Sequence, residues 1–198
     1  MARIPLVPRK QAPWWLRMLY RYAVRRFGAV PEPFMATANH PGLLLTNASH
    51  EWGFEKTAKT LPANVRDIAV YRVAWQVGCS WCVDFGTMLQ RLQGLDTERL
   101  KWIDQYETSP HYSRPERLAI RYADAMTASP MTVTDEQVAE LVDEFGVRGT
   151  VELTYAIALE NHRARMNSAL GITDQGFASG DACRIPVPGE AAASAGAK

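Results

Sequence analysis

The sequence predicts an all-α fold, and three observations support this prediction. Apolar residues recur at helical spacing along nearly the whole chain. Glycines, prolines and capping residues divide this pattern into separate helices. No stretch alternates apolar and polar residues with the enrichment in β-branched side chains that a half-buried strand requires. The chain has 198 residues, of which 47% are hydrophobic and 22% are charged, as expected for one globular domain.

The first expected helix is strongly basic and covers Trp14 to Phe27. Residues 1–27 hold seven of the 22 lysines and arginines and no acid, so the rest of the chain is net negative. This balance excludes a generally basic nucleic-acid-binding protein. We expect residues 1–27 to pack on the rest of the protein or on a partner subunit, rather than on a membrane. The two faces of this helix are expected to carry Trp15, Leu19 and Tyr22 on one side and Arg17, Arg21 and Arg25 on the other.

Three further helices are expected before residue 95. One begins near Leu43, and Leu61 with Pro62 ends that region. The next has its apolar stripe on residues 68–74 and ends at Gly78. The third is marked by Phe85, Leu89 and Leu92 and ends at Gly94.

In the second half of the chain, capping boxes mark the expected helix starts and glycines mark the expected helix ends. Ser113 with Glu116, and Thr134 with Gln137, have the spacing of capping boxes. Gly146 is expected to end one helix, and the last helix is expected from about residue 147 to residue 170, before a closing glycine. Residues 28–184 are thus expected to form a single helical domain. Residues 185–198 are rich in proline, glycine, alanine and serine, which predicts a flexible tail.

Several functional classes find no support. The chain lacks an apolar run of about 18 residues and an apolar signal core, so we expect a cytoplasmic protein with reduced thiols. It also lacks a phosphate-binding glycine loop, a dinucleotide fingerprint and a Gly-x-Ser-x-Gly elbow. The four histidines are scattered without ligand spacing. We therefore expect no cofactor and no metal.

One local pattern carries chemistry, namely Gly78-Cys79-Ser80-Trp81-Cys82. Two cysteines at this spacing, directly after a helix-breaking glycine, can lie in the first turn of the next helix. There the backbone N–H groups and the helix dipole lower a thiol pKa, and the two sulfurs can close a reversible disulfide. A thiolate can attack a peroxide and form a sulfenic acid, with which the second thiol condenses. A zinc site and two inert buried cysteines are the alternative interpretations.

Residues 28–172 resemble the carboxymuconolactone decarboxylase superfamily, in particular its alkylhydroperoxidase D-like branch. The resemblance rests on VRDIAVYRVAWQVGCSWCVDFGTMLQRLQGLD and on the later VELTYAIALENHRARMNSALGI. It implies an all-helical homo-oligomer, in the form of an alkylhydroperoxidase D-like helical bundle, whose CxxC pair reduces peroxides. It also implies a dithiol reductant of the lipoamide or thioredoxin type that restores the thiols.

The resemblance also assigns roles to individual residues. It makes Cys82 the peroxidatic cysteine, Cys79 the resolving cysteine, and Asp67 the carboxylate of a proton relay. The relay histidine expected four residues after the second cysteine is replaced by Gly86. A side chain at that spacing would lie over the cysteine on the helix surface, so the chain departs from the family pattern at a position that matters for proton transfer.

The sequence therefore predicts thiol-dependent reduction of a small hydroperoxide, without a nucleic-acid partner. Two alternatives stay open: a non-catalytic, redox-responsive helical oligomer, and decarboxylase-like chemistry on a small organic acid. Three further side chains are expected to contribute mainly to packing or to pairing between helices. Trp81 is expected either beside a peroxide pocket or in the core, Asp84 is expected to be solvated or to cap the helix, and Arg165 is expected to pair with Asp67 or Glu152.

Overall fold

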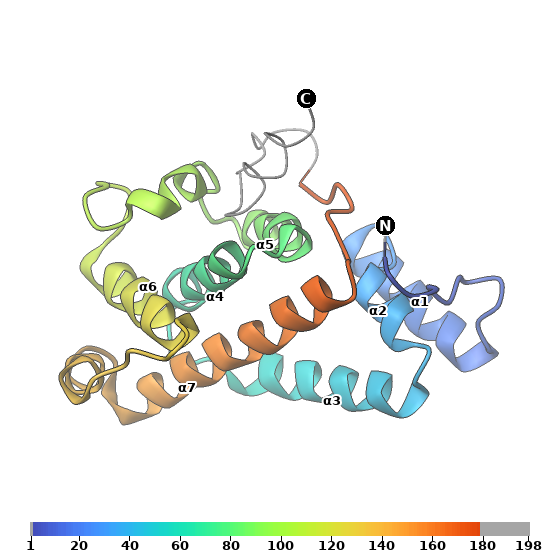
Figure 1. Cartoon of the computed structure of the whole chain (residues 1–198), viewed down its shortest axis with the longest axis horizontal. Helices are drawn as coiled ribbons and strands as arrows, with labels where there is room; N and C mark the ends of the chain where they lie inside the picture. Colours follow the sequence, from blue (N-terminus) through green and yellow to red (C-terminus); the bar gives the residue numbers. More distant parts are fainter. Residues whose placement is uncertain (1, 179–198) are drawn as a thin grey trace.

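The computed structural model describes residues 2–178, which form helices joined by loops, with no strand within this range (Figure 1). The elements are α1 (Trp14–Phe27), α2 (Glu32–Thr37), α3 (Pro41–Thr57), α4 (Ala63–Val77), α5 (Ser80–Leu92), the 3-10 helix η1 (Glu98–Gln105), α6 (Arg114–Thr127) and α7 (Asp135–Ala169). The all-α prediction is confirmed. The tail expected at residues 185–198, and the boundary at residue 184, lie outside the described range.

Helix α4 is central to the packing, because it contacts α5, α6 and α7. Figure 1 shows α3 running along α7 on the side away from α6. One apolar cluster joins α4, α6 and α7: Leu61, Val65, Ala69, Val73, Leu118, Ala119, Tyr122, Ala123, Leu141, Leu153 and Ile157. Full burial of a leucine or isoleucine side chain contributes about 1.5–3 kcal/mol to stability, so this cluster holds the three helices together.

Both predicted capping boxes form at the starts of α6 and α7. The Glu116 carboxylate accepts hydrogen bonds from the backbone N–H of Ser113 at 2.9 Å and from its hydroxyl at 2.7 Å. At α7, the Thr134 hydroxyl accepts from the backbone N–H of Gln137 at 3.3 Å. These bonds satisfy amide groups that the first helical turn leaves without partners.

Helix α7 is interrupted at Gly146, which has φ 68° and ψ 166°. This left-handed backbone is strained for any residue with a Cβ atom, and glycine adopts it freely. The prediction that one helix stops at Gly146 and the last begins at residue 147 is confirmed. The break turns the second segment of α7 so that it lies between α3 and α4 (Figure 1).

Helix α1 packs on α2 and α3 through Leu16 and Tyr20, and its Ala23 is also buried. The expected face was wrong in part, since Tyr22 is 58% exposed while Trp15 and Leu19 lie at the edge of the cluster. Apolar residues occupy more than one side of this helix, so periodicity alone did not select the buried side. The short helix α2 and η1 were not expected. No helix within residues 2–178 combines the length and apolarity needed to cross a bilayer.

Candidate active site

The CxxC pair lies at the amino-terminal end of α5. Gly78 ends α4 in the left-handed conformation, with φ 77°, and this turn allows α5 to start two residues later. Cys79 is the N-cap residue of α5, and its sulfur accepts a hydrogen bond from the backbone N–H of Cys82 at 3.2 Å. The two sulfurs are joined as a disulfide. The expected geometry is therefore present, with Cys82 in the first turn, where the helix dipole favours a thiolate.

Both cysteines are buried, with Cys79 1% and Cys82 6% exposed. Segments from both ends of the described chain pack against the apolar cluster that contains them: Ala2, Ile4 and Leu6 from the amino-terminal end, and Leu170 and Phe177 from the carboxyl-terminal end. Attack on a disulfide requires a thiolate to reach one sulfur directly. At least one of these two covering segments must therefore move before a reductant can reach the disulfide.

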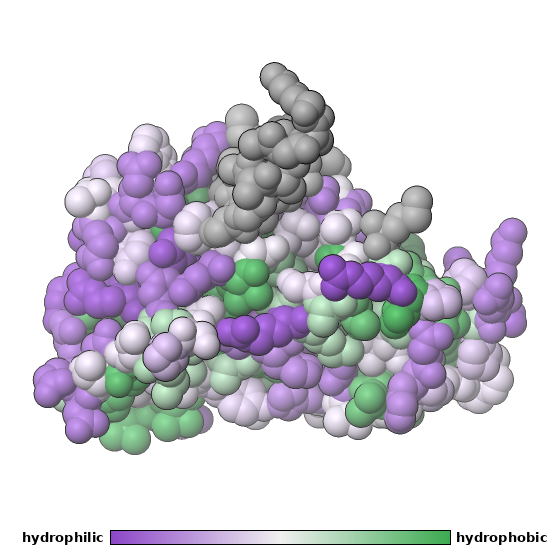
Figure 2. Space-filling model, in the orientation of Figure 1, coloured by the Kyte–Doolittle hydropathy of each residue, from purple (hydrophilic) through white to green (hydrophobic). Residues whose placement is uncertain are grey.

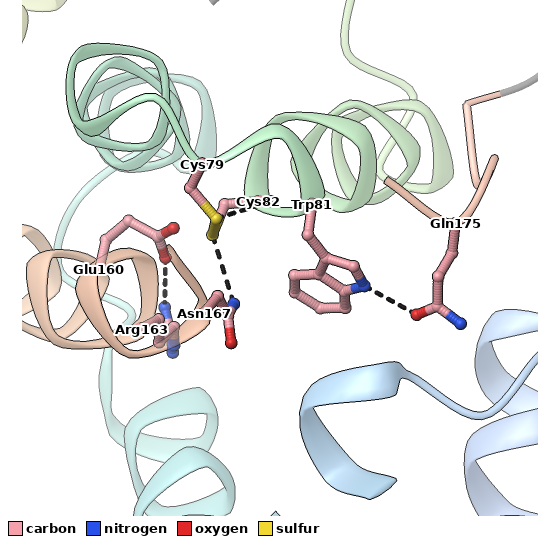
Figure 3. Close-up of a disulfide and its surroundings, with 7 residues drawn as sticks. All are labelled: Cys79, Trp81, Cys82, Glu160, Arg163, Asn167 and Gln175. Carbon is pink, nitrogen blue, oxygen red and sulfur yellow. Dashed lines mark hydrogen bonds and ion pairs between the residues drawn. A yellow bond between two sulfur atoms is a disulfide. The ribbon is translucent and has the colours of Figure 1, made fainter. Parts of the chain in front are cut away.

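Helix α7 supplies a polar contact to the pair. The side-chain amide of Asn167 donates to Cys82 Sγ at 3.5 Å, and Asn167 is itself buried (Figure 3). A hydrogen bond to sulfur favours its charged form and lowers the thiol pKa. The sequence alone gave Asn167 no role at the site. The available signal was a polar residue two helical turns after Glu160, on a face of the last helix that also carries Ala164.

An ion cluster joins the same helix to α3: Glu160 is buried, whereas the side chains of Arg163 and Glu51 are 27% and 39% exposed. Arg163 Nη1 lies 3.1 Å from Glu160 Oε2, and Arg163 Nε donates to Glu51 Oε1 of α3 at 2.7 Å. Arg163 thus bridges the carboxylates of Glu51 and Glu160, and Figure 3 shows Arg163 and Glu160 on the same helix as Asn167. Sequence reasoning missed this cluster, because Glu51 is more than 100 residues before Arg163 in the chain.

Burial raises the pKa of Glu160 from its ordinary value to about 7, Arg163 opposes this shift, and the charge of Glu51 adds to it. The Glu160 side chain thus exchanges a proton near neutral pH. Burial works against the charge of Arg163, but the two carboxylates outweigh this effect and raise the pKa of Arg163. Arg163 is therefore a permanent cation beside Glu160.

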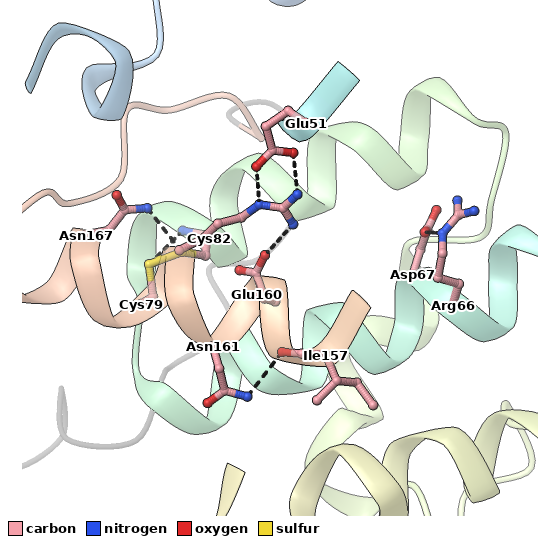
Figure 4. A network of polar contacts seen from close by, with 10 residues as sticks. Glu51, Arg66, Asp67, Cys79, Cys82, Ile157, Glu160, Asn161 and Asn167 are labelled. Atoms are coloured by element: carbon pink, nitrogen blue, oxygen red, sulfur yellow. Dashed lines mark hydrogen bonds and ion pairs between the residues drawn. A yellow bond between two sulfur atoms is a disulfide. The ribbon is translucent and has the colours of Figure 1, made fainter. Parts of the chain in front are cut away.

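Asp67 lies on α4, apart from the disulfide (Figure 4). Its Oδ1 pairs with Arg66 Nε at 2.8 Å, and its Oδ2 is buried without a hydrogen-bond partner among the described residues. The structure brings Cys79 and Cys82 together and gives Asp67 no hydrogen bond to either within the described range. A relay role for Asp67 stays a prediction.

The space beside Gly86 is occupied by an aromatic ring. A Cβ atom at Gly86 would lie 3.4 Å from Cδ2 of Tyr71, which belongs to α4 and is buried. The Tyr71 hydroxyl has no hydrogen-bond partner among residues 2–178. Burial raises the pKa of Tyr71 above its ordinary value, so this hydroxyl stays protonated.

Asp84 holds the carboxyl-terminal segment over α5. Its carboxylate accepts from the backbone N–H groups of Gln175 at 3.0 Å, Phe177 at 2.9 Å and Ala178 at 2.7 Å. Asp84 is 9% exposed, so the expectation of a solvated or capping side chain was wrong. Trp81 is buried, stacks on Phe85 and donates from Nε1 to Gln175 Oε1 at 2.7 Å (Figure 3), which confirms its core interpretation.

The expected partners of Arg165 were wrong. Arg165 donates to the Thr127 carbonyl at 3.5 Å and to the Asn161 side chain at 3.4 Å. Glu152 instead accepts from the backbone N–H groups of Thr60 at 2.8 Å and Leu61 at 3.2 Å, just before α4. Arg165 thus links α7 to the end of α6, and Glu152 links α7 to the loop before α4.

Comparison with known proteins identifies one relative by sequence and several solved structures with the same fold. No family model matches the chain. An uncharacterized protein of Escherichia coli K12, YnjA, is 32% identical over 186 residues, which cover 94% of this chain and 95% of YnjA. Within residues 2–178 no three histidine, cysteine, aspartate or glutamate side chains are grouped as a metal site.

Solved structures share the fold at lower identity. An uncharacterized peroxidase-related protein from Silicibacter sp. TM1040 has a TM-score of 0.79 at 16% identity, covering 90% of this chain and 94% of that one. The alkylhydroperoxidase AhpD core of an uncharacterized peroxidase-related protein from Ralstonia eutropha JMP134 has a TM-score of 0.74 at 17% identity, covering 89% and 94%. A cysteine-to-alanine variant of the debrominase Bmp8, bound to 2,3,4-tribromopyrrole, has a TM-score of 0.75 at 19% identity, covering 89% and 95%.

Proposed function

Because the chain belongs to the family of E. coli YnjA, within the alkylhydroperoxidase D-like branch of the carboxymuconolactone decarboxylase superfamily, we propose that it reduces small hydroperoxides through Cys82 and Cys79. The observation that carries this proposal is the position of the pair. The sulfurs are within bonding distance at the amino-terminal end of α5, and Asn167 donates a hydrogen bond to Cys82 Sγ. These features favour a Cys82 thiolate beside a resolving thiol.

The proposed reaction has two steps. The Cys82 thiolate attacks the O–O bond, forming a sulfenic acid and releasing the alkoxide, which takes a proton to become an alcohol. The Cys79 thiol then condenses with the sulfenic acid, which forms the disulfide and releases water. In sum, two thiols and one hydroperoxide give one disulfide, one alcohol and one water.

A dithiol reductant of the lipoamide or thioredoxin type would complete the cycle. One of its thiolates attacks a protein sulfur to form a mixed disulfide, and its second thiol releases the reduced protein. The reductant is thereby oxidised to its own disulfide. The burial of Cys79 and Cys82 favours a small reductant, or one that displaces the covering segments.

The test is consumption of an organic hydroperoxide in the presence of dihydrolipoamide. We expect turnover by the native protein, no turnover by Cys82→Ser, and loss of recycling in Cys79→Ser, since its sulfenic acid has no resolving partner. Cys183→Ser, which removes the third cysteine of the sequence, is the matched control and should retain activity. Full activity in Cys82→Ser would contradict the proposal.

Two other outcomes would indicate other functions. Disulfide formation with one equivalent of peroxide, without turnover, would favour a redox-responsive protein that is not a catalyst. Release of bromide from 2,3,4-tribromopyrrole, instead of peroxide reduction, would favour debromination, in which two thiols give a disulfide while bromine is replaced by hydrogen. The bromopyrrole is chosen because it is bound in the Bmp8 complex.

A further inference from the structure

Glu160 and Asn167 lie on the same face of α7, two helical turns apart. Asn167 contacts Cys82 Sγ, so this face is directed at the CxxC pair. Ala164, between them on that face, belongs to the same buried cluster as Cys79 and Cys82. Figure 3 shows the Glu160 carboxyl group on the side of the helix that faces the disulfide. A buried carboxyl group is thus placed beside the reactive sulfurs.

Peroxide reduction needs a group that handles a proton, because the departing alkoxide is a strong base. Gly86 has no side chain for this task, and the Tyr71 ring occupies the space beside it. The Asp67 carboxylate is paired with Arg66 and lies apart from the sulfurs (Figure 4). The Asp84 carboxylate is occupied by three backbone N–H groups, whereas Glu160 is a buried carboxyl group that the fold brings next to the pair from α7.

We propose that Glu160 transfers the proton during peroxide reduction, accepting it from the Cys82 thiol and delivering it to the leaving oxygen. The step is balanced, because the thiol proton becomes the hydroxyl proton of the product alcohol and Glu160 returns to its carboxylate form. This inference rests on the proposed peroxide reduction. It adds a residue on α7 for which the resemblance to known peroxidases assigns no role.

The surroundings of Glu160 suit this role. The charged and titratable groups that face it are Arg163 on its own helix, Glu51 on α3, and Cys79 and Cys82 on α5. Arg163 holds Glu160 Oε2 at 3.1 Å and is itself held by Glu51, so the carboxyl group is fixed in position. Its pKa of about 7 lets it both accept and donate a proton near neutral pH.

The decisive variant is Glu160→Gln, which keeps the side-chain shape and an oxygen that can accept from Arg163. Two rates are compared on the reduced protein: the reaction of Cys82 with an organic hydroperoxide, and its alkylation by iodoacetamide, which needs no proton donor. We expect the peroxide rate to fall by about 10²–10⁴-fold. The alkylation rate should stay equal or rise, because removal of a neighbouring negative charge lowers the thiol pKa.

Two further variants test whether the pKa of Glu160 sets the pH profile and whether Tyr71 supplies the proton instead. Glu51→Gln removes a charge that raises the pKa of Glu160, so the acidic limb of the peroxide rate profile should move to lower pH. Tyr71→Phe should leave the peroxide rate unchanged. A large loss of peroxide rate in Tyr71→Phe, with none in Glu160→Gln, would assign the proton to Tyr71 and overturn the inference.

The failure of this inference can be distinguished from failure of the proposed function. Equal peroxide rates in the native protein and Glu160→Gln would overturn the role of Glu160 and leave the peroxidase proposal standing. A parallel loss of peroxide and alkylation rates would show a structural effect and would also overturn it. If the reduced native protein did not react with hydroperoxide at all, the proposed function itself would fall.

Discussion

The side-chain amide of Asn167 donates a hydrogen bond to Cys82 Sγ across 3.5 Å, and this bond connects the last helix to the reactive end of α5. The cysteine spacing alone suggests a site made by α5. The structure shows that α7 contributes the polar groups around the sulfurs. Several measurable consequences follow from this arrangement.

Asn167→Ala should raise the pKa of the Cys82 thiol by about one to two units, since a hydrogen bond to a charged group contributes about 1.5–3 kcal/mol. The ultraviolet absorbance of the thiolate, followed against pH in the reduced protein, measures this shift. Asn161→Ala is the matched control on the same helix, because Asn161 bonds to Thr127 instead. An unchanged titration in Asn167→Ala would show that the bond does not stabilise the thiolate.

Glu160 should make stability depend on pH. Its pKa is about 7 in the folded protein and near 4.5 when unperturbed, so the folded state binds more protons between these values. The free energy of unfolding should therefore decrease as the pH rises through this range, by on the order of 3 kcal/mol. Urea unfolding at about pH 5 and pH 8 measures the change. Glu160→Gln should lack this contribution, and parallel pH profiles would contradict the prediction.

Glu116→Ala should destabilise the fold by about 3–5 kcal/mol, because it leaves the buried guanidinium of Arg99 without its partner. It also removes the capping box of α6 and the bond to Asn64. Glu107→Ala, which breaks the exposed pair with Arg121, is the control and should cost less than about 1 kcal/mol. Equal losses in urea unfolding would show that burial of the first pair is unimportant.

Asp84→Ala should expose the disulfide by releasing residues 175–178. The carboxylate accepts three backbone N–H groups from this segment, and the loss of even one or two such bonds should increase the open population by about 10–100-fold. The rate of disulfide reduction by a small dithiol measures this population. Asp96→Ala, which affects only a local bond to the Glu98 backbone, should leave the rate unchanged. A native-like rate in Asp84→Ala would mean that other segments control access.

We expect the protein to assemble as a homo-oligomer. Val147, Val151 and Tyr155 form an exposed apolar stripe on α7, with exposed fractions of 67%, 62% and 43%. Figure 2 shows hydrophobic side chains gathered near the lower left, over the region of the α7 kink. Val151→Glu should reduce the oligomer mass in analytical ultracentrifugation, whereas Leu92→Glu on α5 should not. A monomeric native protein would contradict this expectation.

Local signals predicted most of the helix boundaries. The two capping boxes and Gly146 act within a few residues of themselves, so their effects can be recognised without the fold. The buried face of α1 was predicted poorly, because apolar residues surround much of that helix and the choice depends on α2 and α3. The short helix α2 lies among prolines and carries too few residues for a periodic pattern.

In the candidate active site, too, the contacts between residues close along the chain could be predicted, and those between distant segments could not. The closeness of Cys79 and Cys82 follows from their spacing after Gly78, because a helix start brings those two positions together. The partners of Arg165 and Asp84 could not be predicted, since their contacts come from segments distant in the chain. Asp84 looked solvated because its burial depends on residues 175–178 folding back over α5.

By itself, the sequence determined the helical class, most of the helix ends and the dithiol at the start of a helix, because these depend on interactions between residues close along the chain. Only the tertiary structure decided which groups surround the sulfurs. It brings Glu51 from α3 and Glu160, Arg163 and Asn167 from α7 to the end of α5. It also places Asp67 on α4, away from them (Figure 4). Burial and the proximity of charges set the pKa of Glu160, and both arise only when the helices pack.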